Sequence, residues 1–590
     1  MTDYLKGGEY LIKKGQPEDT FIPHEMDEEQ KMIYASCEQF IDSEVFPKLD
    51  AIDAMEEGLM SSLLEKAGEL GILSISIPEA YGGMGKDFIS GMLATEACGP
   101  GHSFSVAFAA HTGIGTLPIL YYGNEEQKQK YIPKLGSGEW KASYCLTEPN
   151  AGSDANSGKT KAVLTSDGKH YVVNGQKMWI TNGGFADVFT VFAKIDDDEN
   201  LSAFIIDANT EGITLNPEEK KMGIKGSSTV QVFFSDVKVP VENLLSTRGN
   251  GFKIALNILN IGRVKLAGAT LGAAKKCISF AIQHANERSQ FGQKIANFGA
   301  IQAKIGKMAT KVYALESATY RCSKSIQRAI EGLEASGLSK EKSLLKGVEQ
   351  FAAEAAILKV HGSETLDFCV DEAVQIYGGM GYSAESPVER MYRDSRINRI
   401  FEGTNEINRL LTFDMLIRKT MKGELDLMGP ALKVSEELLE IPDFGGDDLA
   451  PLEEFEKSSE NFKKAVLLVA GAAIKAKGMD LKEEQETVMN ISDLAIHSYI
   501  ADSLVLRLKK VKEMGKLEDY HLHIGELLIY EAGVGVFEAG KEALWSLGQS
   551  DELRMAQIGI KRFSKTKQSN IHETRRKLAQ HLLDANKYDI

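Results

Sequence analysis

The pattern of apolar and polar positions divides the chain into regions of different secondary structure. From about Asp27 to Leu135 apolar residues recur at helical spacing, as in EEQKMIYASCEQFIDSEVF, which predicts amphipathic helices. Between roughly Tyr144 and Val239 short β-branched and aromatic runs such as FTVFAKI and VQVFFSDVKV alternate with Asn-Gly, Gly-rich and acidic turns. That texture predicts an antiparallel sheet or a small barrel. The helical period returns from Gly251.

This second helical period holds, with breaks, to about Lys422, and a third begins at Leu452 and continues to the end. The segment between them contains MGPALK, EIPDFGGDD and LAPLEE, and its turn residues and acids predict a linker. A chain of 590 residues is longer than a single core supports, so several domains are expected. We place the boundaries as an N-terminal extension over 1–27 and domains over 28–143, 144–245, 246–425 and 426–590.

Composition and charge exclude several classes of protein. With 43% apolar residues the chain has the composition of a globular protein. Its net charge of −16 argues against nucleic acid as a partner, because phosphate binding needs a basic surface. The six cysteines are widely spaced, without a CxxC pair or a histidine at zinc spacing. We therefore expect buried, reduced thiols and no metal site.

Targeting and membrane signals are weak. The N-terminal sequence MTDYLKGGEYLIKKGQPEDTF has no apolar core of a signal peptide, so a cytoplasmic, bacterial-type location is expected. The apolar run AVLLVAGAAI near the C-terminus is about half the length of a bilayer span. Lysines flank it, so peripheral contact with a membrane surface is one interpretation, and a buried core helix is the favoured one. These lysines are Lys463, Lys464, Lys475 and Lys477.

Most catalytic signatures are absent: the chain has no GxxxxGK[ST], HExxH or GxSxG, and no complete GxGxxG after a strand. Two other stretches contain residues that could bind a ligand or take part in a reaction. YCLTEPNAGSDA, from Tyr144 to Ala155, runs from a strand into a turn that could present N–H groups and hydroxyls to an anion. NGQKMWITNGG places Trp179 beside Thr181. Taken alone, each has a simpler interpretation, as an ordinary turn and as a core tryptophan.

These two stretches occur in order with NERSQFGQKI, QIYGGMGY and RIFEGTNEINR. The combination resembles the acyl-CoA dehydrogenase family over Glu28 to Thr420. The stretches NGGFADVFTVFAK, KKMGIKGSSTVQVFF, ILNIGR and NFGAIQ, together with the long helical tail, look most like its very-long-chain branch. The resemblance implies an α+β multidomain fold: an N-terminal helical domain, a middle antiparallel β-barrel, a C-terminal four-helix bundle and an appended helical domain.

The resemblance also implies a bound FAD between barrel and bundle. Thr181 would approach the flavin N5 edge, and glycines would let the backbone come close to the phosphates. A second group of residues would meet the pyrophosphate and adenine across a subunit interface. The residues that match the family's flavin positions are Tyr144, Leu146, Thr147, Gly152, Ser153, Trp179, Thr181, Arg288, Gln290, Phe291, Gln375, Gly378, Gly379, Thr404 and Glu406.

Glu402 matches the family's catalytic base, which takes the α-proton of an acyl-CoA while a hydride leaves the β-carbon for the flavin. Burial should raise the pKa of this carboxyl group toward working pH. Some branches carry the base immediately before the equivalent of Arg263, where this chain has Gly262. Arg263 matches a position near the reacting centre, although an ion pair between helices is an equal alternative. The positions that match substrate contacts are Ser153, Asn260, Arg263 and Gly403.

Arginines recur every third residue just before Glu402, at Arg390, Arg393, Arg396 and Arg399. With Glu389 and Asp394 nearby, a salt-bridged surface is the favoured interpretation, and support for the flavin or CoA phosphates is the alternative.

The resemblance implies electron-transfer flavoprotein as the electron acceptor and a homodimer as the assembly, with the tail replacing the packing of a second dimer. Long-chain acyl-CoA is the expected substrate. Gly113 and Gly115 suit a deep acyl tunnel, but Pro118 departs from the branch's pattern. An acyl-CoA oxidase of the same fold and an assembly scaffold are the competing functions.

Overall fold

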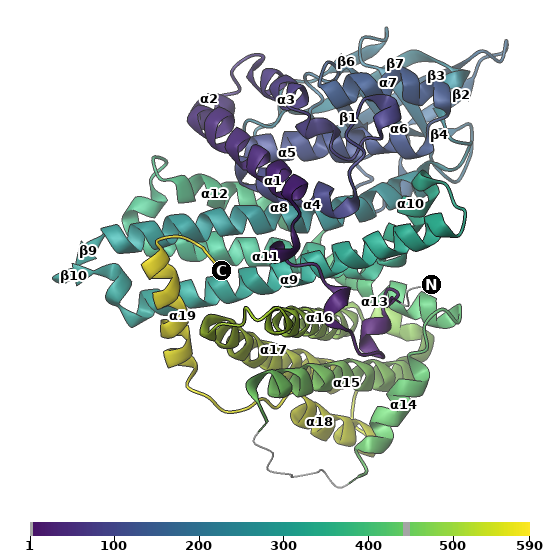
Figure 1. Ribbon diagram of the computed structural model, residues 1–590. Helices are drawn as coiled ribbons and strands as arrows, with labels where there is room; N and C mark the ends of the chain where they lie inside the picture. The colour runs from purple at the N-terminus through teal and green to yellow at the C-terminus, as the bar shows by residue number, and fades with distance from the viewer. Residues whose placement is uncertain (1–3, 441–448) are drawn as a thin grey trace.

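The computed structural model describes residues 4–440 and 449–590, and Figure 1 shows their arrangement. The sheet and the first helices form one end, long helices cross the middle, and the last helices form the opposite end. The predicted order of helices, strands, helices and appended helices is confirmed. The predicted domain boundaries stay predictions.

The first helical region begins where its sequence supplies a cap. The Asp27 carboxylate accepts from the backbone N–H of Gln30, which satisfies an N–H that has no partner within the helix. Ile33, Cys37 and Phe40 then form the buried face. The helices of this region are α1 (Glu28–Phe40), α2 (Leu49–Asp53), α3 (Leu59–Glu69), α4 (Phe88–Cys98), α5 (Ser103–Ala109), α6 (Leu117–Tyr122) and α7 (Glu125–Ser137).

One described stretch, Ser103–Tyr122, has the length and the mean hydropathy, 1.3, of a membrane span. Within the protein, 78% of its apolar window is buried. The fold therefore already covers most of the apolar surface of this stretch.

The middle region is a mixed sheet rather than the antiparallel barrel predicted above. The strands pair in the order β6-β7-β3-β2-β4-β5-β8, and β1 pairs with β4. Both β1 and β2 run parallel to β4, and among the described strands the path stays open at β6 and β8. The strands are β1 (Ala142–Cys145), β2 (Lys161–Leu164), β3 (His170–Thr181), β4 (Val188–Ile195), β5 (Ser202–Asp207), β6 (Ile213–Leu215), β7 (Thr229–Pro240) and β8 (Leu244–Leu245).

The prediction of a closed barrel failed for a physical reason. Alternating short runs identify strands, but closure depends on which edges meet, and that is a long-range property. Here the edge strands are short: β6 has 3 residues and β8 has 2. Short edge strands offer few hydrogen bonds with which to close a sheet.

The second helical region crosses the middle of the molecule. Helices α8 and α9 have 37 residues each, and a small hairpin, β9 (Ser289–Gln290) and β10 (Gln293–Lys294), joins them. Its division as a four-helix bundle stays a prediction. The helices are α8 (Gly251–Glu287), α9 (Gly299–Ala335), α10 (Lys340–Gln350), α11 (Ala352–Tyr377), α12 (Pro387–Ser395) and α13 (Asn405–Met421).

The appended region is helical, and it begins inside the predicted linker. MGPALK lies in a helix, α14, because Pro430 occupies the first turn, where its missing N–H costs no helical hydrogen bond. All of EIPDFGGDD after Glu440 lies outside the described residues. The helices are α14 (Met428–Glu437), α15 (Pro451–Lys477), α16 (Gln485–Glu513), α17 (Asp519–Ser546), α18 (Asp551–Phe563) and α19 (Ile571–Ala585).

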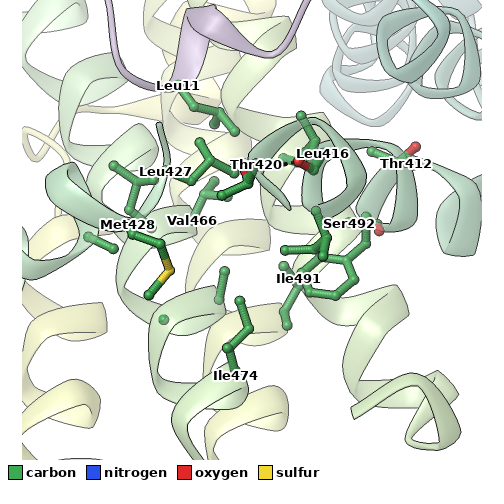
Figure 2. Close-up of a pocket in the computed structure, with 17 residues that line it drawn as sticks. Leu11, Thr412, Leu416, Thr420, Leu427, Met428, Val466, Ile474, Ile491 and Ser492 are labelled. Carbon is green, nitrogen blue, oxygen red and sulfur yellow. Dashed lines mark hydrogen bonds between the residues drawn. The ribbon is translucent and has the colours of Figure 1, made fainter. Parts of the chain in front are cut away.

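The run AVLLVAGAAI belongs to α15 and lies mainly in the core, as favoured above. Its flanking lysines are paired within the protein. Lys463 is buried against Asp502, Lys464 pairs with Glu437, Lys475 with Glu552 and Lys477 with Glu484. Figure 2 shows an apolar cavity beside this helix, between α13, α14, α15 and α16, lined by Leu416, Leu427, Val466, Ile474 and Ile491 among others.

The N-terminal segment packs against the appended helices at the far end of the chain (Figure 1). The Tyr10 ring lies edge-on to Tyr499 of α16, with ring centroids 4.9 Å apart. The Tyr10 hydroxyl also donates to the carbonyl of Ala495. The two ends of the sequence thus form a single packed region.

Candidate active site

Glu402 lies on a short loop between α12 and α13 with an unusual backbone. Its φ of 59° falls in the left-handed region, which a glutamate rarely adopts, and the next residue, Gly403, has a φ of 81°. The side-chain amide of Asn408 donates to the carbonyls of Glu402, Gly403 and Thr404 at 3.3, 2.8 and 3.0 Å. Arg263 Nε donates to the Glu402 carbonyl at 3.3 Å. These contacts hold a strained conformation of the kind that collects at functional sites.

The carboxylate of Glu402 packs against Gly262 of α8. A Cβ at position 262 would lie 2.9 to 3.0 Å from the carboxylate atoms, closer than real contacts allow. Glu402 Oε2 is buried and has no hydrogen-bond partner among the described residues. A buried carboxylate oxygen without a partner is costly, so its retention points to function.

The surroundings of Glu402 shift the pKa of its carboxyl group. Burial raises the pKa of Glu402 to about 7, against the opposing positive charges of Arg263 and Lys359. The hydroxyl of Tyr144 is also buried and has no partner within the described structure, and burial together with the charge of Glu402 raises its pKa. A carboxylate with a pKa near 7 is well matched to general base chemistry at neutral pH.

Arg263 joins the predicted substrate residues to this loop. Its Nη1 donates to Asn260 Oδ1 at 2.7 Å, one turn earlier on α8. Among the described residues Arg263 makes no ion pair, so the alternative of a helix-to-helix salt bridge is wrong. Asn260, Arg263, Glu402 and Gly403 are therefore brought together. The backbone N–H of Glu402 donates to no acceptor in the described part of the chain.

The two stretches that match the family's flavin motifs, YCLTEPNAGSDA and NGQKMWITNGG, also lie side by side. The Met178 N–H donates to the carbonyl of Thr147 at 2.9 Å, and Ser143 Oγ donates to the carbonyl of Thr181 at 2.8 Å. Trp179 sits at a bulge between β3 and β7, has a φ of 60° and is 53% exposed. The simpler interpretation of Trp179 as a core residue is wrong, since the bulge turns the ring outward.

The loop that follows β1 is anchored at its base and open at its tip. Lys177 Nζ donates to the carbonyl of Leu146 at 3.1 Å and to Glu148 Oε1 at 2.7 Å, and this pair is buried. At the tip, Gly152 and Ser153 are exposed. A Cβ added to Gly152 would meet nothing, so open space lies over the backbone.

A second group of predicted cofactor residues lies apart from those on the sheet. Figure 1 places the β9–β10 hairpin at the end of α8 and α9, far from the sheet. At that end His284 of α8 stacks on Tyr377 of α11, with ring centroids 4.0 Å apart. Phe291 is 92% exposed, and a Cβ on Gly378 or Gly379 would meet no atom. The residues gathered there are Arg288, Gln290, Phe291, Gln375, Gly378 and Gly379.

Thr404 and Glu406 begin α13, directly after the Glu402 loop. The Thr404 hydroxyl accepts from the N–H of Ile407 at 3.3 Å and caps the helix. Glu406 is exposed in the first turn, where hydrogen bonds to its carboxylate lower its pKa. Both therefore have structural roles here besides the predicted contacts.

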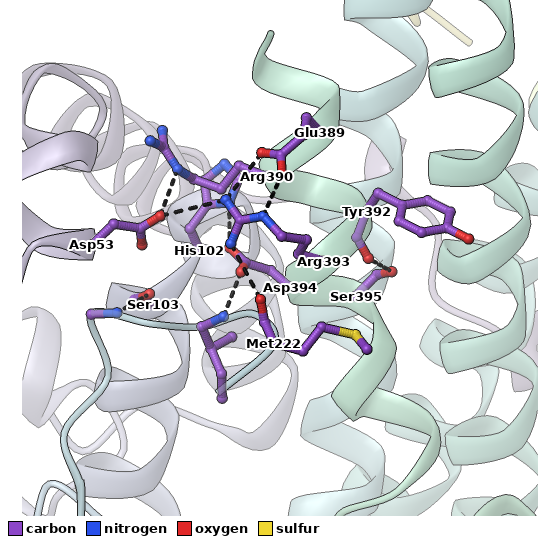
Figure 3. Close-up of polar contacts among 12 residues, drawn as sticks. Asp53, His102, Ser103, Met222, Glu389, Arg390, Tyr392, Arg393, Asp394 and Ser395 are labelled. Carbon is purple, nitrogen blue, oxygen red and sulfur yellow. Dashed lines mark hydrogen bonds and ion pairs between the residues drawn. The ribbon is translucent and has the colours of Figure 1, made fainter. Parts of the chain in front are cut away.

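The arginine run before Glu402 is mainly an ion-paired surface, as favoured above. Figure 3 shows Arg390 and Arg393 turned toward Asp53, and Arg393 also pairs with Glu389. Arg399 pairs with Asp367. Their partners come from α2, α11 and α12, so these pairs join the first helices to the helices around the site.

Asp394 of α12 lies within the same set of contacts. It accepts from the Ile224 N–H, and it lies 2.9 Å from Nδ1 of the buried His102 (Figure 3). The sheet, the first helices and α12 thus meet at one side chain.

Three residues that surround Glu402 were not identified from the sequence. Lys359 is a fully buried lysine on α11, in the largely apolar run FAAEAAILKV, and that contrast was an available signal. Gly262 was considered only as the absence of a rival base. Asn408 gave no signal, since its role depends on three carbonyls that it meets only in the fold. All six cysteines are free and buried, as expected.

Comparisons with known proteins agree along most of the chain. The family models described as the N-terminal, middle and C-terminal domains of acyl-CoA dehydrogenase match residues 27–139, 143–237 and 249–416. A further model, also described as an acyl-CoA dehydrogenase C-terminal domain, matches residues 461–562. The match therefore reaches into the appended helices.

A probable acyl-CoA dehydrogenase of Bacillus subtilis is 43% identical over 100% of this chain and 99% of its own length. The human mitochondrial very long-chain specific acyl-CoA dehydrogenase is 44% identical over 65% of this chain and 57% of that protein. A crystal structure of an acyl-CoA dehydrogenase from Bacillus anthracis, complexed with FAD, is 43% identical, has a TM-score of 0.95 and covers 99% of this chain.

Proposed function

The chain belongs to the acyl-CoA dehydrogenase family, and from this premise we propose that it oxidises a long-chain acyl-CoA to the trans-2-enoyl-CoA, with Glu402 as the base. The proposal places the chain in fatty acid β-oxidation. The observation that carries it is the buried carboxylate oxygen of Glu402, which packs against Gly262 and has no hydrogen-bond partner in the described structure.

The proton is taken by a group poised for that task. At neutral pH a carboxyl group with a pKa of about 7 is substantially ionised. Burial makes this carboxylate a stronger base than an ordinary glutamate. The backbone N–H of Glu402 donates to no acceptor over residues 4–440 and 449–590, so it is available to the thioester oxygen as negative charge develops there. Arg263, which is 3% exposed, adds positive charge beside the same loop.

The residues on the sheet fit a bound FAD. The exposed ring of Trp179 offers a flat surface, Thr181 lies beside it, and the space over Gly152 admits close approach of a phosphate to the backbone. When bound, FAD supplies the hydride acceptor for the β-carbon. Tyr144, Leu146, Thr147 and Ser153 would hold it on the same side.

The second group of predicted cofactor residues supports a homodimer. One chain holds the sheet residues and the hairpin residues at separate places, so a single chain would not close a dinucleotide site from both. A second copy would bring its Phe291 and Gly378 to the distal part of the cofactor. We propose electron-transfer flavoprotein as the electron acceptor, since the family resemblance implies it.

An anaerobic titration tests this function. The purified protein should be yellow, and palmitoyl-CoA should bleach the flavin absorbance, whereas Glu402→Gln should bind flavin and leave it unbleached. Rapid peroxide formation in air would instead indicate an oxidase, and a colourless protein that gains no flavin would indicate a scaffold. Dye reduction with acyl-CoAs from butyryl to eicosanoyl would then establish the chain length, for which Pro118 leaves medium chains as the alternative to long ones.

A further inference from the structure

Asn405, the first residue of α13, is tied into the protein by both ends of its amide. It is 2% exposed and follows closely after Glu402. Its Oδ1 accepts from Lys359 Nζ at 2.7 Å, and its Nδ2 donates to Glu364 Oε1 at 3.0 Å. The position of α13's first turn, and so of the Glu402 loop, is therefore linked to α11.

Glu364 passes this link to Arg409, one turn further along α13. Arg409 Nη1 and Nη2 donate to the Glu364 carboxylate at 2.9 and 3.1 Å. This paired geometry fixes orientation as well as distance.

The appended helix α16 holds Arg409 from the other side. Arg409 Nε donates to Asp493 Oδ1 at 2.8 Å. Ser492 Oγ donates to the backbone carbonyl of Arg409 at 2.6 Å. A side chain and a backbone group of α13 are thus both held by neighbouring residues of α16.

From this continuous run of contacts we infer that Asp493, on the appended helix α16, is a positioning residue for the Glu402 loop. It orients Arg409, which orients Glu364 and through it Asn405. The inference rests on the proposed function, because it assigns the appended helices a part in placing the base.

Attachment of the appended helices does not depend on this contact. Asp502 of α16 forms a buried ion pair with Arg321 of α9, and Lys510 of α16 pairs with Glu25. Neither pair includes a residue of the Glu402 loop. Asp493 differs from them because its partner, Arg409, belongs to α13, the helix that directly follows the Glu402 loop.

A matched pair of variants in the FAD-loaded full chain tests the inference. Asp493→Ala removes the acceptor, and Asp493→Asn keeps an oxygen at the same place. Glu25→Ala is the control, because Glu25 forms an ion pair with Lys510 of α16, the helix that carries Asp493. The side chain of Glu25 is 31% exposed, against 30% for Asp493. The readouts are hydrogen exchange of the amides over 402–408, kcat with palmitoyl-CoA, and the pH profile of kcat/KM.

Asp493→Ala should speed exchange over 402–408 and lower kcat by roughly 2- to 30-fold. The pH midpoint should rise, because Lys359 would no longer be held at a fixed distance from Glu402. The other groups that face Glu402, Arg263 of α8 and Tyr144 of β1, stay in place. Asp493→Asn should stay near wild type, and Glu25→Ala should leave all three readouts unchanged.

Wild-type exchange and kcat in Asp493→Ala would overturn the inference, and so would equal changes in Glu25→Ala. The exchange measurement needs no turnover. If the wild-type protein oxidised no acyl-CoA, the proposed function would fail while the exchange result still decided the positioning role.

Discussion

Two buried glutamates in different regions of this protein have opposite chemistry. Glu316 of α9 is 1% exposed and pairs with Lys275 of α8 and with Arg507 of α16, at 2.5 Å for the latter. These partners lower the pKa of Glu316 to about 2 in spite of its burial. Burial instead raises the pKa of Glu402 to about 7, since Glu402 Oε2 has no hydrogen-bond partner in the described chain.

The difference shows what a base requires. Glu316 is buried and so is Oε2 of Glu402, so burial alone does not distinguish the two groups. Glu316 receives direct charged donors and joins three helices. Arg263 donates to Asn260 and to the backbone carbonyl of Glu402, and Lys359 donates to Asn405. Among the described residues, neither cation donates to the Glu402 carboxylate. Withholding direct donors keeps the Glu402 carboxylate basic.

The largest expected effect is on turnover. Glu402→Gln should lower kcat with palmitoyl-CoA by ~10² to 10⁴-fold, the usual contribution of a general base, with flavin still bound. It should also raise Tm at neutral pH, because it removes a buried carboxylate that lacks a donor. Stopped-flow flavin reduction and thermal unfolding measure the two. Undiminished reduction would remove Glu402 from its proposed role.

Glu316→Gln should act on stability and spare the chemistry. Removing one partner of a buried ion pair leaves charge uncompensated and costs about 3–5 kcal/mol. We therefore expect a large fall in the denaturant midpoint of unfolding, with kcat of the folded protein near wild type. Glu573→Gln, which breaks the exposed Lys577–Glu573 pair, is the control and should change little. A denaturant midpoint as high as wild type would contradict the structural role of Glu316.

Gly262→Ala should separate position from charge. The added Cβ would push the end of the Glu402 side chain aside, and misplacement of a reacting group by about 1 Å can cost about 10²-fold in rate. Stability should hold, since alanine favours helix over glycine. Gly332→Ala on α9 is the matched control, because among the described residues its Cβ would meet only Tyr4, at 3.6 Å. Equal kcat in the two variants would argue against the packing of Glu402 on Gly262.

The smallest expected effect is a slope with pH. Below about pH 7, kcat/KM should fall about tenfold per pH unit, because Glu402 must be ionised to accept a proton. Stability should move the other way between about pH 4.5 and 7: the native state holds a proton that the unfolded state has released, so the contribution of Glu402 decreases as pH rises.

Glu316 should show the reverse. Its stabilisation is complete above about pH 4.5 and is lost as pH falls toward 2. Thermal unfolding of wild type, Glu402→Gln and Glu316→Gln across this range separates the two slopes. The opposite contributions of Glu402 and Glu316 would be contradicted if both variants changed the pH dependence of Tm in the same direction.

The sequence predicted much of the fold because its signals are local. The capping aspartate, Asp27, and the spacing of Ile33 and Cys37 specify α1 within one short stretch. The open sheet and α14 were missed. Edge closure depends on strands far apart in the chain, and a proline and a glycine suggest a linker unless Pro430 is placed in a first turn.

The candidate site was predicted by residue and not by contact. Trp179 was expected near Thr181 from their spacing, but only the bulge in β3 turns its ring outward. Lys359 and Asp493 gave no motif, because their roles arise from helices brought together across 46 and 84 residues of chain.

By itself the sequence determined the order of helices and strands, the set of motifs and the identity of the acid at 402, since each is written in neighbouring residues. Only the tertiary structure decided that this acid lies against Gly262 with no donor from the described residues, that the predicted cofactor residues lie at two separate places, and that α16 contacts the helix that follows the loop. Those features depend on packing between distant segments, and packing geometry is not encoded in any single stretch of chain.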